Sequence, residues 1–508
     1  MRRKQRMSFG ERLAACGGAL PRRTSAARRT TVGAALVMAT VGGLTTGTLA
    51  HPRQAAAAER AAEPAAQQAE VAEDLNGDGY ADLVSGAPGG TVGGKAKAGY
   101  VAVTYGSAQG LDTSDKQLVS RSTSGVPGAA TAGQQFGKSF SKGDLDGDGY
   151  ADLVIGSADA SAGSVILWGS AKGLTGGTAV PGFGTTPQIG DFDGDKKADL
   201  ALLGDPGTSG DDPVEQPAAL WKGPVTRSGT PAEKLDFLDR SEWGDENSSA
   251  TSISGPSTAR GVADVNGDGR QDLIFRRYEG DGVYSSDALL GSPSGFTVSA
   301  GPTDGGGDMD AGDVDGDGFD DLVVSGGSDL FDEVTVVFGT KDGLSSSRRQ
   351  TFDQSLEGFP GEAPSSGELL GSCVSVADVT GDGRAEVALG IRWKDSGDTD
   401  DAGAIALLHG AETGVTGKGS QLLDQDTPGV PGVAEENDEF GAACALLDVD
   451  GDGHRDVNVS STQENDSSGA VWSLRGTATG VTTDNATSFG PSDLDAPANG
   501  ARFGSSMR

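Results

Sequence analysis

One acidic pattern occurs seven times in this chain, and it constrains the fold more than any other feature of the sequence. Each copy reads Asp-x-(Asp/Asn/Thr)-Gly-Asp-(Gly/Lys)-x-x-(Asp/Glu) and is followed by an apolar run. Recurrence at intervals of roughly 50 to 70 residues indicates a repeat architecture, with one supersecondary unit per repeat. The seven copies begin at Asp74, Asp144, Asp191, Asp264, Asp313, Asp378 and Asp448.

Each repeat also predicts several short strands. Residues 136–140 precede the second acidic loop, and the apolar residues 152–156 follow it. A third strand then ends in a Gly-Leu turn, as at Gly173-Leu174, and a weaker fourth strand follows. Four short strands per repeat, without helical periodicity, are typical of a propeller blade.

The two ends of the repeat region complement each other. The first repeat begins at its acidic loop with no strand in front, whereas residues 501–507 resemble that missing strand and have no loop behind them. We therefore predict an all-β, seven-bladed β-propeller of four-stranded blades, closed by the C-terminal strand joining blade 1. Such closure removes exposed sheet edges.

The acidic loops have the composition of calcium sites. Ca²⁺ prefers hard oxygen ligands, and Gly at position 6 tolerates the left-handed backbone of a sharp turn. Position 12 does not carry the Glu of an EF-hand, so position 9 is the expected closing ligand. The alternative is a set of Asp/Gly turns without metal. The expected ligands, at positions 1, 3, 5, 7 (by its carbonyl) and 9, are Asp74, Asn76, Asp78, Tyr80 and Asp82; Asp144, Asp146, Asp148, Tyr150 and Asp152; Asp191, Asp193, Asp195, Lys197 and Asp199; Asp264, Asn266, Asp268, Arg270 and Asp272; Asp313, Asp315, Asp317, Phe319 and Asp321; Asp378, Thr380, Asp382, Arg384 and Glu386; Asp448, Asp450, Asp452, His454 and Asp456.

Charge supports this interpretation and excludes others. Clustered carboxylates repel one another unless they are neutralised, so we expect up to seven structural Ca²⁺ ions. Lys196 in the third loop, and Thr380 with Glu386 in the sixth, make these two the weakest candidates. The net charge of −35 argues against a nucleic-acid partner. Only three His are present and no catalytic motif is found, so the chain is not expected to be an enzyme.

The N-terminal region differs from the rest in composition. Residues 1–58 are rich in Lys and Arg and contain an uncharged run after Arg28-Arg29, which predicts a signal peptide with a long basic n-region. Sec and twin-arginine export both remain open, as does an uncleaved membrane anchor. Residues 59–73 predict a disordered linker, and residues 74–508 the propeller. We expect a secreted protein, extracellular or associated with the cell surface, without a membrane span in its mature chain.

Several short motifs carry a resemblance to a known family. These are Phe136-Gly137, Phe440-Gly441, Phe503-Gly504 and Gly86-Ala87-Pro88. Together with the acidic loops, they make residues 74–508 resemble FG-GAP repeat proteins, whose best-known members are the N-terminal propellers of integrin α-subunits. The resemblance implies a seven-bladed propeller with Ca²⁺ on its lower face and an extracellular interaction role. Phe-Gly is missing before the third to fifth loops, and Leu370-Gly371 replaces it before the sixth.

In similar propellers the face opposite the calcium loops binds partners. Two clusters that break the acidic trend are candidates there, Arg276-Arg277-Tyr278 and Arg392-Trp393-Lys394. Local ion pairs with Glu279, Asp281, Asp395 and Asp398 are the alternative. We expect a monomeric adhesion or interaction module with an extracellular protein or glycan ligand. A lectin is the second hypothesis, and an enzyme with a site in the central channel is the third.

Two cysteines lie on expected inner strands of neighbouring blades. Cys373 and Cys444 precede the sixth and seventh acidic loops by five and four residues, respectively. Side chains with this offset point to opposite faces of their blades, and adjacent blades meet through opposite faces. A disulfide between the blades and two free buried thiols are both compatible with the sequence.

Overall fold

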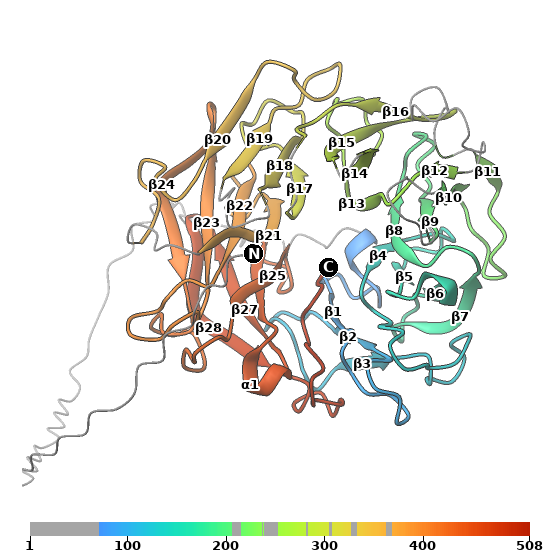
Figure 1. Ribbon diagram of the computed structural model, residues 1–508, viewed down its shortest axis with the longest axis horizontal. Coiled ribbons are helices and arrows are strands. Elements are labelled where there is room, and N and C mark those ends of the chain that lie inside the picture. The colour runs from blue at the N-terminus through green and yellow to red at the C-terminus, as the bar shows by residue number, and fades with distance from the viewer. Residues whose placement is uncertain are drawn as a thin grey trace, which may run out of the picture. The chain divides into compact units, whose positions relative to one another are not determined.

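Seven antiparallel sheets follow one another along the chain and surround a common centre (Figure 1). The computed structural model describes residues 71–205, 215–235, 237, 252–280, 283–303, 307–326, 333–361 and 368–508. The predicted signal peptide and most of the predicted linker lie outside these residues. The last three linker residues form a 3-10 turn, η1 (Val71–Glu73). No helix within the described residues is long and apolar enough to cross a membrane.

Each sheet forms one blade, and its strands follow the order of the chain. The strands of blades 1 to 3 are β1 (Leu83–Ala87), β2 (Tyr100–Thr104) and β3 (Lys116–Val119); β4 (Phe140–Gly143), β5 (Asp152–Ile155), β6 (Ser164–Trp168) and β7 (Thr175–Val180); β8 (Thr185–Gly190), β9 (Asp199–Leu203), β10 (Glu215–Lys222) and β11 (Glu233–Leu235), with β12 (Ser252–Ser254) also paired to β10. A 3-10 turn, η2 (Ala160–Ala162), precedes β6.

Blades 4 to 7 have four strands each. These strands are β13 (Thr258–Ala263), β14 (Asp272–Gly280), β15 (Val283–Ser292) and β16 (Gly295–Ser299); β17 (Met309–Gly312), β18 (Asp321–Ser325), β19 (Val334–Val337) and β20 (Arg349–Phe352); β21 (Leu369–Ala377), β22 (Glu386–Arg392), β23 (Ala404–Ala411) and β24 (Gly414–Leu423); β25 (Phe440–Leu447), β26 (Asp456–Ser461), β27 (Ala470–Thr477) and β28 (Gly480–Phe489). The short helix α1 (Glu464–Ser467) lies between β26 and β27.

The C-terminal segment completes blade 1 and closes the ring. The Val84 N–H donates to the Arg508 carbonyl (2.9 Å), and the Arg508 N–H donates to the Val84 carbonyl (3.1 Å). The Gly86 N–H donates to the Ser506 carbonyl (2.9 Å). The predicted seven-bladed, all-β fold and its mode of closure are therefore confirmed.

The core lies between the blades rather than within one central layer. Strands β1, β2, β5 and β6 are buried along their whole length, because each is covered on both faces. One apolar cluster joins Val101 and Val103 of blade 1 to Leu153 and Val165 of blade 2. Each blade thus buries its apolar residues against its neighbours, as expected of a repeat that cannot fold alone.

Two of the three Phe-Gly pairs differ from the prediction in their local structure, whereas Phe440-Gly441 begins the strand β25 as predicted. Phe136-Gly137 lies in a turn before β4, not in a strand, and Phe503-Gly504 also lies in a turn. Their backbone groups bond to the preceding blade instead. The Phe136 N–H donates to the Ala98 carbonyl (2.9 Å), and the Phe503 N–H to the Ser468 carbonyl (2.9 Å). The Phe-Gly pair is therefore a junction between two blades.

A disulfide joins the inner strands of blades 6 and 7. Cys373 of β21 and Cys444 of β25 are bonded, with their Cα atoms 5.8 Å apart. Of the two alternatives left open by the sequence, the structure contains the disulfide.

Candidate metal sites and the central channel

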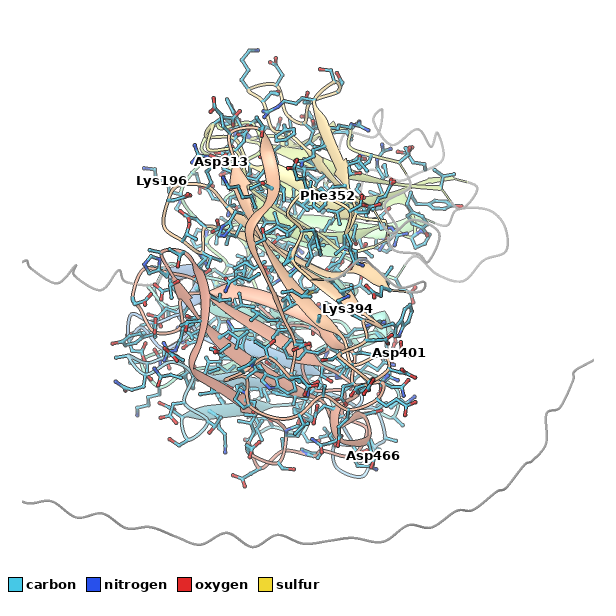
Figure 2. The ribbon with its side chains drawn as sticks, turned by 90° about the vertical axis from the view of Figure 1, so that its left-hand side faces the viewer. Lys196, Asp313, Phe352, Lys394, Asp401 and Asp466 are labelled. Atoms are coloured by element: carbon cyan, nitrogen blue, oxygen red, sulfur yellow. A yellow bond between two sulfur atoms is a disulfide. The ribbon has the colours of Figure 1, made fainter. Side chains whose placement is uncertain are left out.

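In blades 2 to 7 the acidic loop connects the first and second strands, and in blade 1 it precedes β1, so the loops lie on one face of the ring. Figure 2 shows Lys196 and Asp313, both in acidic loops, on one side, and Lys394, Asp401 and Asp466 on the other. Neighbouring loops are also bonded to one another. The Ala151 N–H of the second loop donates to the Asp74 carbonyl of the first (2.9 Å), and the Ala81 N–H donates to the Asp448 carbonyl of the seventh (3.2 Å). The loops thus form a connected rim.

The position-1 carboxylate organises each loop. In the second loop, Asp144 Oδ1 accepts from the Gly147 N–H (2.8 Å) and Oδ2 accepts from the Gly149 N–H (2.9 Å). Gly149 is at position 6 and has φ +91°. In the third loop, Lys196 takes this position with φ +66° and still donates to Asp191 Oδ2 (2.8 Å). Lys196 therefore does not change the loop, although a Lys in this backbone region is strained.

Carboxylates converge in four of the seven loops. In each group the three residues offer oxygen atoms within 4.8 Å of one another, the distance expected around one cation. All four loops have Asp at position 3. The groups, formed by positions 1, 3 and 9, are Asp144, Asp146 and Asp152; Asp191, Asp193 and Asp199; Asp313, Asp315 and Asp321; Asp448, Asp450 and Asp456.

The first and fourth loops have Asn at position 3, and its amide is used inside the loop. Asn76 Nδ2 donates to Asp78 Oδ2 (2.9 Å), and Asn76 Oδ1 accepts from the Asp78 N–H (2.9 Å). Asn266 makes the same two bonds with Asp268. The position-5 carboxylate, expected as a ligand, accepts from the N–H of position 7 in all seven loops. Position 5 does not belong to the converging groups of the described residues, and neither do the first and fourth loops.

The position-9 carboxylate has a second role that the spacing did not reveal. Asp152 Oδ2 accepts from the Leu145 N–H (2.9 Å), and Oδ1 accepts from the Gly169 N–H at the end of the third strand (2.8 Å). The same pair of backbone bonds recurs at positions 82, 199, 272, 321 and 456. Burial raises the pKa of Asp152 to about 7 and that of Asp456 to about 8, although these backbone bonds oppose the shift. Position 9 therefore holds three strands together.

The sixth loop departs from this pattern. Glu386 Oε2 accepts from the Val379 and Thr380 N–H groups (2.9 and 3.1 Å), while Oε1 lies 3.1 Å from His409 Nδ1. The hydrogen bond to Glu386 raises the pKa of His409. The residues of the sixth loop are not among the converging groups of the described chain. The sequence had made this loop one of the two weakest candidates for calcium binding.

Basic side chains partly neutralise the four converging loops. Arg227 contacts Asp146 (2.6 Å), Arg348 contacts Asp315 (2.5 Å), Arg475 contacts Asp450, and Lys222 contacts Asp193. The third loop has the most ion pairs. Lys222, which contacts Asp193, also contacts Asp195 (3.4 Å), and Lys197 contacts Asp195 as well (3.1 Å).

Unpartnered oxygens test whether the loops suit a cation. Asp146 Oδ1 and Asp450 Oδ1 are buried without any hydrogen-bond partner, and so is the Thr380 hydroxyl of the sixth loop. Buried oxygens without partners are costly, and hard oxygens are what Ca²⁺ prefers. The second and seventh loops, which combine three converging carboxylates with such an oxygen, therefore fit the ion best.

The two basic clusters predicted on the opposite face are engaged in local contacts. Arg277 bonds to Asp287 (2.8 Å) and Glu279 (2.6 Å). Arg276 stacks over the Tyr284 ring, 4.2 Å from its centroid. In the second cluster, Lys394 pairs with Glu368 (3.3 Å), and Arg392 pairs with Glu439 (3.5 Å). Local pairing is thus observed, mostly with acidic partners other than the predicted ones; Asp281 lies outside the described residues.

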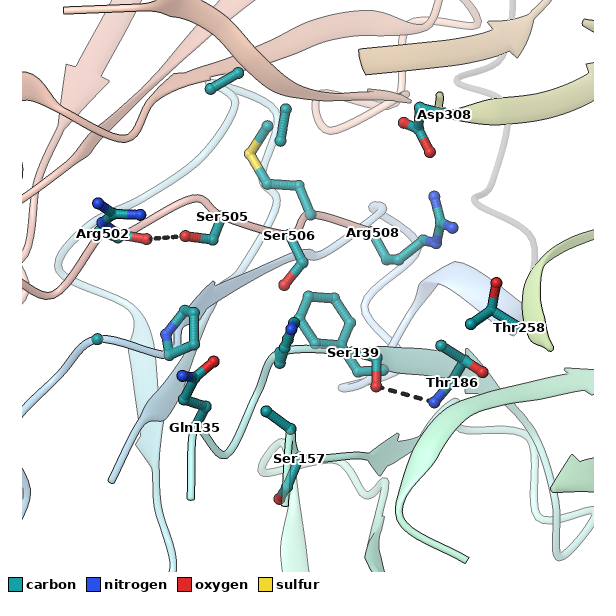
Figure 3. Close-up of a pocket in the computed structure, with 18 of the residues that line it drawn as sticks. Gln135, Ser139, Ser157, Thr186, Thr258, Asp308, Arg502, Ser505, Ser506 and Arg508 are labelled. Atoms are coloured by element: carbon teal, nitrogen blue, oxygen red, sulfur yellow. Dashed lines mark hydrogen bonds between the residues drawn. The ribbon is translucent and has the colours of Figure 1, made fainter. Parts of the chain in front are cut away.

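A large cavity opens at the centre of the ring on this opposite face (Figure 3). Its volume is about 1180 Å³, and its described lining has five basic and two acidic side chains, Lys97, Lys138, Arg260, Arg502 and Arg508 with Asp308 and Asp466. This positive excess contrasts with the strongly acidic chain. Sequence reasoning expected a central channel but not its lining or its charge, because the lining residues come from all parts of the chain.

Several hydroxyls of this channel are bonded to backbone groups, whereas Ser467 Oγ bonds to Gln463 Oε1 (2.7 Å) and the buried Ser157 Oγ has no partner. Ser505 Oγ donates to the Arg502 carbonyl (2.5 Å), Ser506 Oγ to the Gly137 carbonyl (3.1 Å), and Ser139 Oγ accepts from the Thr186 N–H (3.2 Å) (Figure 3). The described lining contains no His. This arrangement suits the binding of a polar or anionic ligand.

The geometry defines a class of protein: a seven-bladed propeller whose inner hairpins carry acidic, cation-type loops. Comparison with known sequences identifies the repeat. The sequence model of the FG-GAP repeat matches residues 66–104 and 136–168. The matched residues lie in blades 1 and 2, so these two blades are similar to FG-GAP repeats.

Curated relatives match one part of the chain. Integrin alpha-PS5 of Drosophila melanogaster is 39% identical over 106 residues, which are 20% of this chain and 10% of the integrin. A phosphatidylinositol-glycan-specific phospholipase D of Rattus norvegicus is 35% identical over 97 residues, 19% of this chain and 11% of that protein. The chain thus matches about a tenth of each relative.

Solved structures are more distant. A putative 6-phosphogluconolactonase from Bacteroides fragilis has 13% sequence identity and a TM-score of 0.37, over 79% of this chain and 93% of that chain. The AofleA protein of Arthrobotrys oligospora has 12% identity and a TM-score of 0.36, over 69% of this chain and 86% of that one. Similarity at this level identifies no activity.

Proposed function

We propose that this protein is an extracellular FG-GAP propeller, stabilised by calcium on one face and acting as an adhesion or interaction module through the other. The convergence of three carboxylates in each of four loops carries the calcium part of this proposal. Free Ca²⁺ at the millimolar level outside cells is sufficient to fill weak sites of this kind. The predicted signal peptide and the similarity to an integrin α-subunit support the extracellular role.

The central cavity is the proposed place of ligand contact. Its basic side chains include Lys97, Lys138 and Arg502, which are exposed at the rim. Exposed cations beside a concave, polar surface favour a partner that carries anionic or polar groups. We propose a non-enzymatic role because Ser139, Ser505 and Ser506 bond to backbone atoms rather than to a general base.

A lectin is the second candidate. The cavity is lined by several neutral hydrogen-bonding side chains, Gln135, Ser139, Ser157, Thr186, Gln188 and Thr258. Such groups can bond to sugar hydroxyls without a net charge on the ligand. A glycan partner would therefore use the same cavity with a smaller contribution from the basic rim.

Binding to cell surfaces would test the proposal. Labelled full-length protein is incubated with intact cells of the producing organism in millimolar Ca²⁺, before and after the cells are treated with protease or with periodate. We expect bound protein that is lost after protease treatment. Binding that is lost only after periodate treatment supports the lectin instead. Absence of calcium-dependent binding to the cells contradicts both the protein-binding and the lectin proposals.

Charge variants would locate the contact. The triple variant K97S/K138S/R502S removes the exposed rim cations, and K172S removes an exposed lysine from a turn on the acidic-loop face. We expect the triple variant to lose most surface binding and K172S to retain it. Equal binding by both variants contradicts a contact at the cavity.

A further inference from the structure

Three carboxylates also converge on the face opposite the acidic loops. Glu435, Asp438 and Glu464 offer oxygen atoms within 4.8 Å of one another. Glu435 and Asp438 belong to the segment that connects β24 of blade 6 to β25 of blade 7, and Glu464 opens α1 within blade 7. Figure 2 shows Asp466, in the same short helix, on the side opposite Asp313. This cluster is therefore separate from the seven acidic loops.

A buried amide points into the cluster from the end of blade 6. Gln425 is only 2% exposed, and its Nε2 donates to Glu464 Oε2 (2.9 Å). Its Oε1 has no hydrogen-bond partner. A buried carbonyl oxygen without a partner is unfavourable, and such an oxygen is also a common ligand of Ca²⁺. The amide thus supplies an observation independent of the carboxylates.

The junction between blades 1 and 2 has the same local structure and allows a direct comparison. After β3 the Thr123 N–H donates to the Ser120 carbonyl (3.0 Å), and after β24 the Thr427 N–H donates to the Asp424 carbonyl (3.2 Å). The second residue of each turn is Arg121 in the first junction and Gln425 in the second. The two positions are therefore equivalent.

Arg121 supplies a built-in cation at the first of these junctions. Its guanidinium donates to the carbonyls of Pro127 (2.8 Å) and Gly163 (2.6 Å), and it lies over the Phe136 ring at 5.2 Å. The residue two before the Phe-Gly pair is Gln134 here and Asp438 in the other junction. The first junction thus combines the positive charge of Arg121 with the neutral Gln134. The second junction combines the neutral amide of Gln425 with the carboxylate of Asp438.

No built-in cation neutralises the second junction within the described residues. Two basic side chains of blade 6 have other acidic partners, since Arg392 pairs with Glu439 (3.5 Å) and Lys394 with Glu368 (3.3 Å). Arg502 bonds through its backbone N–H to the Ser467 carbonyl of α1 (3.0 Å), and no ion pair among the described side chains joins it to the three carboxylates. Burial raises the pKa of Glu464 to about 7, and the neighbouring Asp438 carboxylate adds to this effect. Crowded carboxylates of this kind require a counter-ion to be ionised together.

We propose that Glu435, Asp438 and Glu464 bind a Ca²⁺ ion at the junction of blades 6 and 7. The Gln425 amide, whose Nε2 contacts Glu464 in this structure, turns over to present its unpartnered Oε1 to the ion. The ion takes the place that the Arg121 guanidinium has at the junction of blades 1 and 2. Water completes its coordination, because Ca²⁺ takes six to eight oxygens. The ion connects the end of blade 6 to blade 7 and is a site additional to the acidic loops.

Hydrogen exchange of the full-length protein, resolved by peptide, tests this site locally. Peptides covering residues 430–440 and 461–469 report on the cluster, whereas peptides covering 448–456 report on the seventh acidic loop. At a Ca²⁺ concentration ten times the Kd, we expect exchange of the first two peptides to slow about tenfold relative to EDTA. Because the two regions are read separately, failure of the acidic loops to bind calcium would not be confused with failure of this site.

Three variants make the test specific. Gln425→Arg installs the built-in cation of the first junction, so its peptides should exchange slowly with or without calcium. In D438N/E464Q, which keeps the side-chain shapes, the calcium response of these peptides should disappear. Glu436→Gln removes an exposed charge next to the cluster and should retain the full response.

Two results would overturn the proposal. One is wild-type exchange at 430–440 and 461–469 that is the same in calcium and EDTA. The other is a calcium response that persists in Gln425→Arg or in D438N/E464Q. If the double variant does not fold, Gln425→Arg and the wild type still decide the question.

Discussion

At the scale of single residues, one carboxylate per loop has two roles. The spacing of the acidic motif predicted position 9 as a calcium ligand, and its oxygens do approach those of positions 1 and 3 in four loops. Its bond to the third strand could not be predicted, because the partner of Asp152 is Gly169, 17 residues further along the chain. A sequence pattern describes the loop, whereas this contact depends on how the strands fold back.

The position-9 carboxylates predict opposite pH dependence with and without calcium. Burial raises the folded-state pKa of Asp152 to about 7 and of Asp321 to about 8, above the unfolded value of about 3.9. Without metal, the folded state therefore binds more protons than the unfolded state. Its free energy of unfolding should rise as pH falls from about 8 to about 5, and it should decrease again when pH is raised through the same range. With calcium bound, protons compete with the ion and stability should fall over the same range. Thermal unfolding in EDTA and in calcium would measure both trends; parallel trends would contradict this account.

The loops should also differ individually in their response to substitution. Asp450 contacts one cation, Arg475, and keeps a buried Oδ1 without a partner, whereas Asp193 and its neighbour Asp195 are paired with two lysines. We expect Asp450→Asn to remove about 2 to 3 kcal/mol of calcium-dependent stabilisation at a hundred times the Kd. Asp193→Asn should remove less. The difference in free energy of unfolding between calcium and EDTA measures this, and an equal loss in both variants would show that pairing with lysine does not matter.

At the scale of elements, the junction between blades is made of backbone rather than side chains. Gly403, which precedes β23, has φ +84°, and a Cβ on it would lie 2.2 Å from the Phe440 carbonyl oxygen. Gly99 and Gly469 have the same relation to Phe136 and Phe503. The Phe-Gly motif could be recognised in the sequence. Its contact with a glycine of the preceding blade could not be predicted, because that glycine belongs to another repeat.

Alanine substitutions at two glycines should distinguish the cost of a steric clash between blades from the cost of a strained backbone. Gly403→Ala combines a left-handed backbone with a clash against a neighbouring blade, and we expect it to cost more than about 3 kcal/mol. Gly397→Ala is the matched control in the same connection, since Gly397 has φ +60° and open space around it. The control should cost only about 1 to 2 kcal/mol. Chemical denaturation measures both, and equal costs would exclude a role for close packing between blades.

At the scale of the whole molecule, the ring is closed by a segment of only a few residues. Phe503 is fully buried and Met507 is 3% exposed, and both belong to the cluster that joins blade 7 to blade 1. Composition and repeat number predicted seven blades and this closure, because the two ends of the repeat region were complementary. A central channel was expected of such a ring, but its basic lining was not predicted, since the lining residues share no motif.

Removal of the closing segment should affect the entire ring. Deletion of residues 503–508 exposes the edge of β1 and the apolar faces of blades 1 and 7. We expect the deleted protein to unfold at a much lower denaturant concentration or to aggregate, because open sheet edges pair with other chains. The substitution Arg508→Ala, which keeps the backbone bonds to Val84 and leaves Phe503 and Met507 in place, is the control. Equal stability of the full-length and shortened proteins would contradict closure by this segment.

The central claim is that the acidic loops bind calcium and that the ion stabilises the folded ring. The most direct measurement is thermal unfolding of the full-length protein in millimolar Ca²⁺, in Mg²⁺ and after treatment with EDTA, with the bound metal counted in the same samples. A ligand that binds only the folded state stabilises it by mass action. The account predicts a large fall in Tm with EDTA that Ca²⁺ reverses and Mg²⁺ does not. Folded protein that contains no calcium and has the same Tm in all three solutions would contradict it.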